Sequence, residues 1–204
     1  MKFGIMFDTH VDKWDLIRYA EELGYDAAWV PDSQMLWSDC YATLALAAVN
    51  TQRIRIGTGV SIAGTRIAPV TVHSIASINR LAPGRVFLGI GTGHTAMRVM
   101  GQDPMPLREF REYLRVVREL LAGRAVDYTC AGQTRNIAFL HRDRHYIDLE
   151  HRIPIYVAAN GPLALKATGE FGDGWMTITT DPDMVREALA LIGAGAAKAG
   201  RALP

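Results

Sequence analysis

The chain has 204 residues, of which 49% are hydrophobic, enough for one sizeable core. A net charge of +1 with 21% charged residues gives no basic field for nucleic acid and no acidic tail. No apolar stretch approaches the roughly 20 residues of a membrane span, and Met1–Phe7 lacks a signal peptide's apolar region. The two cysteines, Cys40 and Cys130, lack the spacing of a metal site or disulfide framework. We therefore expect a reduced, cytoplasmic protein without metal, nucleic-acid partner or membrane partner.

Short apolar runs typical of buried strands alternate with helical segments along most of the chain. The predicted strands span residues 2–6, 27–30, 53–57, 86–90, 155–158 and 175–178. The predicted helices begin near residues 13, 40, 69, 107, 162 and 182. Candidate N-cap residues precede three of these helices, namely Asp12, Asp39 and Asp181.

This alternation implies parallel strands joined by helices, arranged as an open doubly wound sheet or as a TIM barrel. Polar or glycine residues follow each strand, as in Asp32-Ser33-Gln34, which favours the barrel because its strand ends share one functional rim. We expect an α/β fold of the TIM (β/α)8 type, forming one domain over residues 1–204. The pattern gives six strand–helix units, whereas a closed barrel has eight, so we expect a C-terminally short barrel.

Residues 124–153 lack a helical pattern and interrupt the alternation. Val126–Thr129 and Ile137–Leu140 flank Gly132 and predict a β-hairpin insertion, which we expect to act as a lid because long insertions in compact domains are usually functional. Histidines 141, 145 and 151 lie among many charged residues, which favours a solvated loop over a metal site.

Two predicted strands end in Gly-Thr-Gly, at residues 57–59 and 91–93. Glycine lets the backbone approach a flat or anionic ligand closely, so these strand ends predict a cofactor bed. The glycine spacing over residues 89–93 is not that of the dinucleotide-binding fingerprint. Taken alone, Gly59 favours a simple β-bulge, and Asp32 could cap the turn after its strand.

His94 and His10 each follow a predicted strand. An unperturbed histidine pKa of about 6.5 suits proton transfer at neutral pH. We treat both as candidate catalytic residues, the alternative being histidines that only hydrogen-bond a loop on the rim.

Five segments carry a family resemblance: Glu22–Asp32, Ile56–Val60, Ala82–Gly93, Ile153–Pro162 and Gly172–Trp175. In this order they resemble the bacterial luciferase-like superfamily of flavin- and deazaflavin-dependent oxidoreductases. The resemblance is greatest to members that use coenzyme F420, such as methylenetetrahydromethanopterin reductase. It implies a homodimeric oxidoreductase that transfers a hydride between F420 and a small organic substrate.

The resemblance also implies residue roles. Asp32 matches an acidic residue that hydrogen-bonds the deazaflavin ring, and Gly59-Val60 matches a non-proline cis peptide bond that backs the ring. Trp37 matches an aromatic residue on the substrate side, which makes it a third catalytic candidate. The remaining cofactor-binding candidates line the pocket or receive the cofactor phosphate: Thr92, Gly93, Ala159, Asn160, Gly161 and Pro162.

At two positions the sequence differs from one group of superfamily members. Sugar-phosphate dehydrogenases of the superfamily carry His after the strand-two aspartate and Glu after the Gly-Thr-Gly of strand four, whereas this chain has Ser33 and His94. The resemblance therefore does not extend to their mechanism. Two alternatives remain: an FMN-dependent monooxygenase of the same superfamily, and a non-catalytic flavin-binding or inactive shortened member.

Overall fold

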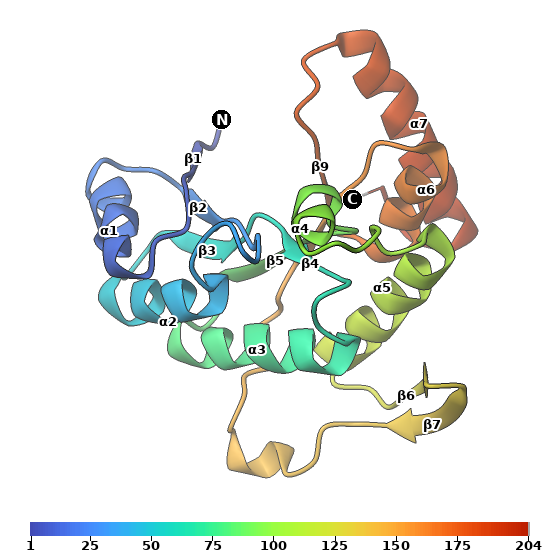
Figure 1. Cartoon of the computed structure of the whole chain (residues 1–204), viewed down its shortest axis with the longest axis horizontal. Coiled ribbons are helices and arrows are strands. Elements are labelled where there is room, and N and C mark those ends of the chain that lie inside the picture. The colour runs from blue at the N-terminus through green and yellow to red at the C-terminus, as the bar shows by residue number, and fades with distance from the viewer. Residues whose placement is uncertain (204) are drawn as a thin grey trace.

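The computed structural model describes residues 1–203 as a curled parallel sheet with helices along its outer side (Figure 1). The strands lie in the order β1 (Gly4–Met6), β2 (Ala27–Val30), β3 (Arg55–Thr58), β5 (Val86–Gly91), β8 (Ile155–Ala158) and β9 (Gly174–Met176), and the short β4 (Ser61–Ile62) also pairs with β5. The helices are η1 (Val11–Lys13), α1 (Asp15–Glu22), α2 (Cys40–Asn50), α3 (Ala68–Leu81), α4 (His94–Val99), α5 (Leu107–Leu121), η2 (Arg142–Arg144), α6 (Pro162–Phe171) and α7 (Pro182–Lys198).

The order of the strands in the sheet follows their order in the chain, and all their pairings are parallel. A doubly wound sheet would instead reverse its strand order at a switch point. The sheet curls into a half-barrel whose end strands, β1 and β9, lie on either side of an open gap in the ring of elements (Figure 1). The predicted barrel-type α/β fold is therefore confirmed, with the predicted six strand–helix units.

The two faces of each strand have different roles. Outward-facing residues such as Ile56, Leu88 and Val157 are fully buried against the helices and form the core. On the inner face Trp29 and Phe87 stack with ring centroids 4.2 Å apart, and Tyr156 lies 5.5 Å from each ring. This alternation explains why the sequence carries apolar runs at every strand.

Helix boundaries follow the predicted capping signals at most positions. The Asp39 carboxylate accepts the N–H of Ala42 at the start of α2, and Asp181 caps α7 in the same manner. The prediction of Asp12 as a cap is wrong, because η1 occupies that position and Trp14 is the N-cap of α1.

Three short features differ from the sequence-based expectation. Helix α4 and strand β4 were not predicted, since neither is long enough to show a periodic pattern. The hairpin consists of β6 (Val126–Cys130) and β7 (Gln133–Ile137), so its second strand begins earlier than predicted. The turn needs only Ala131 and Gly132, whose φ angles of 49° and 75° suit a tight two-residue connection.

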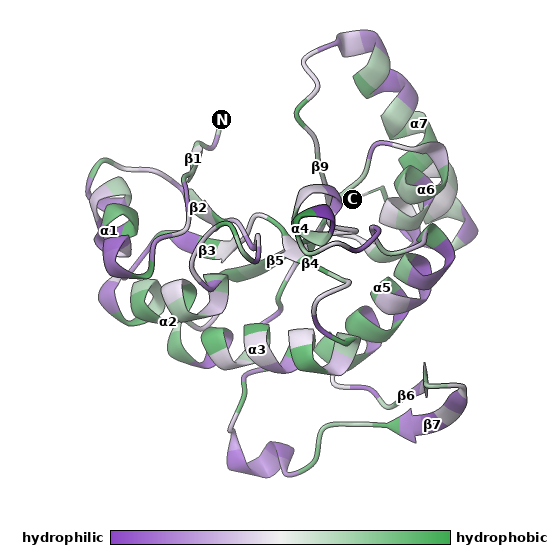
Figure 2. Cartoon of the chain, in the orientation of Figure 1, coloured by the Kyte–Doolittle hydropathy of each residue, from purple (hydrophilic) through white to green (hydrophobic). Residues whose placement is uncertain are grey.

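The insertion packs below α3 and α5, and its hairpin and η2 stand out as mostly hydrophilic (Figure 2). The amide of Asn79, near the end of α3, donates to the carbonyls of Asp148 and His151 at 3.2 and 2.9 Å. The Asp148 N–H donates to the Ala76 carbonyl at 3.0 Å. These contacts lie at the end of α3 that leads into β5, opposite the edge where the strands end. We therefore do not place a substrate beneath this segment.

Candidate functional site

The carboxyl ends of the parallel strands gather along one edge of the sheet, called here the C-terminal edge. Val30 pairs with Thr58, Ile62 with Gly91, and Ala158 with Met176. Because parallel strands run in one direction, the residues that follow these pairs share this edge. The loops after β1, β2, β4, β5 and β8 therefore lie together, as the sequence predicts.

Two glycines, Gly59 and Gly91, lie at the centre of this edge and are called here the glycine wall. A Cβ on Gly91 would lie 3.2 Å from Cγ2 of Val60 and 3.4 Å from Cβ of Ala158, so three strand ends converge there. A Cβ on Gly59 would lie 2.8 Å from Cβ of Trp29. The peptide bond between Gly59 and Val60 is cis, which confirms the bond implied by the resemblance. The two glycines thus lie close against Trp29, Val60 and Ala158, where a larger side chain would meet these neighbours.

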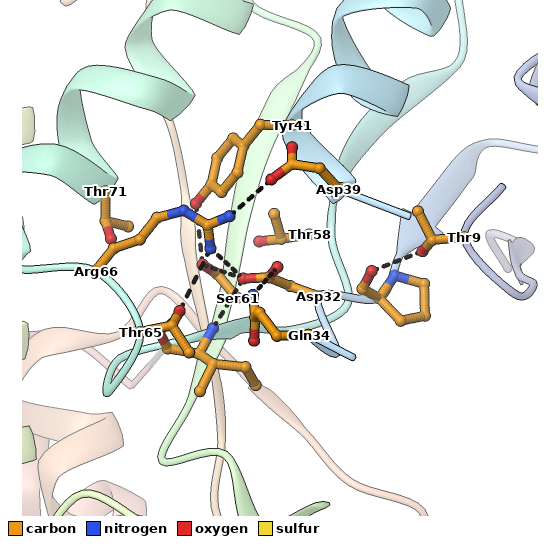
Figure 3. Close-up of polar contacts among 12 residues, drawn as sticks. Thr9, Asp32, Gln34, Asp39, Tyr41, Thr58, Ser61, Thr65, Arg66 and Thr71 are labelled. Atoms are coloured by element: carbon orange, nitrogen blue, oxygen red, sulfur yellow. Dashed lines mark hydrogen bonds and ion pairs between the residues drawn. The ribbon is translucent and has the colours of Figure 1, made fainter. Parts of the chain in front are cut away.

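Asp32 lies in a buried polar network that includes Ser61 and Arg66 (Figure 3). Its side chain is 2% exposed, and its Oδ1 accepts a hydrogen bond from the Gln34 amide at 2.6 Å. Its Oδ2 accepts from Nη1 of Arg66 at 2.6 Å and lies 3.4 Å from both Oγ of Ser61 and N of Ile62. Both carboxylate oxygens therefore already have protein donors.

Arg66 joins Asp32 to a second carboxylate. Its Nη2 donates to Oδ2 of Asp39 at 3.0 Å, and its guanidinium carbon lies 4.7 Å from the centre of the Tyr41 ring. Burial lowers the pKa of Arg66, but its neighbours, Asp32 foremost, together outweigh burial, so the net pKa lies above its ordinary value. The guanidinium therefore remains charged.

Neutral groups surround the ion pair. Burial is the main cause that raises the pKa of the Cys40 thiol, and the Asp32 charge adds to it. Burial likewise raises the pKa of Tyr41, whose hydroxyl lies 2.9 Å from Oγ of Ser61. Both groups therefore stay protonated at neutral pH and supply the network with hydrogen-bonding groups rather than charge.

Two catalytic candidates lie near the ends of β1 and β2. His10 is exposed, and Trp37 is half-buried in the loop after β2. Thr9 connects these loops: its hydroxyl donates to the Pro31 carbonyl at 2.6 Å, and its carbonyl accepts the N–H of Ser38 at 3.0 Å. The structure thus brings the loops of His10 and Trp37 together at the C-terminal edge.

His94 is the first residue of α4 and is exposed. Gly93 precedes it with a φ of 85°, a conformation that favours glycine, and a Cβ there would lie 2.3 Å from Cγ2 of Ile62. Thr92 is half-buried, and its carbonyl accepts the N–H of Met105 at 3.2 Å. The end of β5 therefore lies directly against the loop that Asp32 holds.

The remaining predicted residues surround the start of α6. Asn160, Gly161 and Pro162 are exposed, and no side chain caps the helix at Gly161. A Cβ on Gly161 would meet nothing within 4 Å. The helix thus begins at an exposed position without a side-chain cap, which favours an anion. Ala159 is buried, and its carbonyl accepts from Nε1 of Trp175 at 2.7 Å.

Sequence patterns did not identify Arg66, Tyr41 or Ser61 as site residues. Their association depends on the folding of α2, β4 and α3 around Asp32. Two hollows of the surface, of about 310 and 190 Å³, lie away from this network, one within residues 140–150 and one beside Arg118 and Asp173. Within residues 1–203 no His, Cys, Asp and Glu group could hold a metal ion, and no helix is long and apolar enough to cross a membrane.

Comparisons with known proteins agree with this geometry. A family model described as luciferase-like monooxygenase matches residues 2–204. The 5,10-methylenetetrahydromethanopterin reductase of Methanolobus tindarius is 36% identical over 98% of this chain and 61% of its own length. The reductase of the same name from Archaeoglobus fulgidus is 33% identical, over 98% of this chain and 60% of its own length.

A solved structure gives the same picture. The coenzyme F420 dependent tetrahydromethanopterin reductase of Methanopyrus kandleri superposes with a TM-score of 0.78 and 28% identity, covering 98% of this chain and 62% of that one. The chain thus spans about three fifths of the length of these relatives. With a family match over nearly its whole length and relatives above 30% identity, the chain belongs to the luciferase-like monooxygenase family.

Proposed function

We propose that this chain binds coenzyme F420 at the C-terminal edge of its sheet and acts in hydride transfer between F420 and a small organic substrate. The relatives named above are reductases that, by name, act on tetrahydromethanopterin derivatives, and one of them is described as F420-dependent. The deazaflavin ring, when bound, would supply the redox chemistry. The protein would supply binding, orientation and proton transfer.

The glycine wall carries this proposal. A planar tricyclic ring needs a surface with little side-chain bulk, and Gly91 adds none between Val60 and Ala158. Gly59 extends it toward Trp29. The residues present therefore fit the ring, with Thr92 and Gly93 at its border.

The start of α6 supports a place for the cofactor phosphate. Its first N–H groups have no side-chain cap, and Asn160, Gly161 and Pro162 are exposed around them. Free N–H groups and the helix dipole together stabilise an anion at such a position. Ala159 would hold this loop in place through its bond with Trp175.

The exposed histidines supply candidate proton-transfer groups. We assign His94 the exchange of a proton with the substrate, because it follows the glycine that borders the wall. His10 and Trp37 would contact the substrate from the loops after β1 and β2. Ser33 stands where sugar-phosphate dehydrogenases of the superfamily have His, so we do not propose a sugar phosphate as substrate.

Titration with each cofactor tests the proposal. The change in F420 fluorescence on adding protein measures the dissociation constant, and the same titration with FMN is the comparison. We expect saturable binding of F420. Tight binding of FMN without binding of F420 would support the alternative, an FMN-dependent monooxygenase. If the protein binds F420 but does not oxidise reduced F420 in the presence of any of a panel of small carbonyl and imine compounds, the result would support a non-catalytic member.

The predicted homodimer requires a separate experiment, a measurement of the molecular mass in solution.

A further inference from the structure

Both carboxylate oxygens of Asp32 already accept hydrogen bonds from the protein. Its side chain is 2% exposed, Gln34 donates to Oδ1 at 2.6 Å, and Arg66 donates to Oδ2 at 2.6 Å. A carboxylate that accepts short bonds at both oxygens, and lies within 3.4 Å of two further donors, has little remaining capacity. A direct bond to the ring would have to form at a carboxylate that is almost wholly buried and already bonded at both oxygens.

Arg66 is held as firmly as Asp32. Its side chain is 17% exposed, and its two terminal nitrogens reach two different carboxylates, Asp32 and Asp39. Its backbone carbonyl accepts the hydroxyl of Tyr113 at 2.9 Å. A planar guanidinium can hold two acceptors in fixed directions, which a lysine ammonium cannot do. Arg66 thus fixes the Asp32 carboxylate relative to α2 and α3.

The pair acts on the segment that follows the glycine wall. Ser61 and Ile62 lie 3.4 Å from Oδ2 of Asp32 through their hydroxyl and N–H groups. The Ile62 side chain in turn lies against Gly93 at the end of β5. Movement of the Asp32 carboxylate would therefore change the backbone on which the ring is proposed to rest.

We propose that Asp32 and Arg66 form one ion-paired positioning unit, which shapes the cofactor site through Ser61 and Ile62 without Asp32 touching the ring. This inference rests on the proposed function. It makes Arg66 a positioning residue that acts through Asp32. It also predicts that replacing both residues harms binding less than replacing one. A buried charge left alone is far more disruptive than the removal of both charges together.

The test compares F420 affinity in four variants of the full chain. Arg66→Met leaves Asp32 without its partner, and we expect the F420 dissociation constant to rise roughly tenfold or more. Asp32→Asn leaves Arg66 with Asp39 alone and weakens binding as well. In Asp32→Asn/Arg66→Met the constant should return to within about threefold of the wild-type value. Arg80→Met, on the exposed side of α3, is the matched control and should bind as the wild type does.

The outcomes separate the two proposals. If the wild type binds neither F420 nor FMN, the proposed function fails and this inference fails with it. If the wild type binds and the double variant binds no better than Asp32→Asn, Asp32 is a direct ligand and the inference alone is overturned. Unchanged binding by Arg66→Met overturns it too. The absorption spectrum of bound F420 is a second readout: it should match the wild type in the double variant and differ if the ring has lost a direct contact.

Discussion

The carbonyl oxygen of Ile192 on α7 lies 1.9 Å from the point where a Cβ on Gly169 of α6 would be, so the two helices touch backbone to backbone. A second contact lies one turn away, where a Cβ on Gly195 would come within 2.0 Å of the Lys166 carbonyl oxygen. Neither position has room for a methyl group. These two glycines therefore fix the closest approach of α6 and α7.

Gly195→Ala should separate α6 from α7. We expect the free energy of unfolding to fall by about 1–3 kcal/mol, the usual cost of overpacking, despite the better helix propensity of alanine. Gly193→Ala is the matched control on the same helix, since its Cβ would lie 3.6 Å from Leu203, an ordinary contact. It should raise stability by about 0.5–1 kcal/mol. Urea unfolding measures both, and equal effects would contradict the close packing.

Glu21→Gln should destabilise the turn before β3. The Glu21 carboxylate is 9% exposed and accepts the N–H groups of Gln52, Arg53 and Ile54. Burial raises its pKa, but these backbone bonds outweigh burial and leave the pKa below its ordinary value. The amide of glutamine would face the same donors, so we expect a loss of about 1–3 kcal/mol at pH 7.

The pH dependence of this loss follows from the lowered pKa. The contribution of Glu21 is complete above its unfolded-state pKa of about 4.3 and is lost as pH falls through the still lower folded-state value. The stability difference between wild type and Glu21→Gln should therefore shrink below about pH 4.3. Glu22→Gln is the control, because its side chain is 63% exposed and lies 3.9 Å from Arg18. A difference that persists unchanged at low pH would rule out this account.

Gly91→Ala should obstruct the glycine wall with little effect on folding. The new methyl group would lie 3.2 Å from Val60 and 3.4 Å from Ala158, which requires only small shifts. It would, however, project from the surface proposed to hold the ring, and we expect F420 affinity to fall roughly tenfold or more. Fluorescence titration and thermal unfolding, with Gly193→Ala as control, distinguish a blocked site from a damaged fold. Unaltered affinity would place the ring elsewhere.

Asn79→Ala should release the insertion from α3. The Asn79 amide donates to the carbonyls of Asp148 and His151, so its removal should cost about 1–3 kcal/mol and speed proteolytic cleavage within residues 140–150. Asn136→Ala, which removes one exposed bond to Asp127 in the hairpin, is the control. F420 affinity should be unchanged, because these contacts lie away from the C-terminal edge. A loss of affinity would instead support the lid role expected from the sequence.

The sequence predicted the strands and long helices well, because their signals are local. Apolar runs marked β2 and β8 at their observed bounds, and the three- and four-residue spacing of apolar residues marked α5. Short elements lack such signals. Helix α4 begins at a glycine with positive φ, and β4 has only two residues, so periodicity could reveal neither.

The candidate site was predictable only in part. Strand-end residues such as Asp32 and His94 follow from the parallel architecture, and the cis bond before Val60 from the resemblance alone. Arg66 has no local signal: it lies 34 positions after Asp32, and only the packing of α2 and α3 brings the two together. Likewise, long insertions suggested a lid, but only the contacts of Asn79 show on which end of the sheet this one lies.

Neighbouring residues of one strand serve different purposes, because one faces the helices and the next faces the inside of the half-barrel. In β5, Leu88 and Ile90 anchor the helices, while the intervening Gly89 and neighbouring Gly91 face inward. Adaptation to a new reaction can therefore proceed through inward positions and loops while outward positions preserve foldability. Mutational libraries confined to inward and loop positions should retain a larger share of folded members than random libraries of equal size.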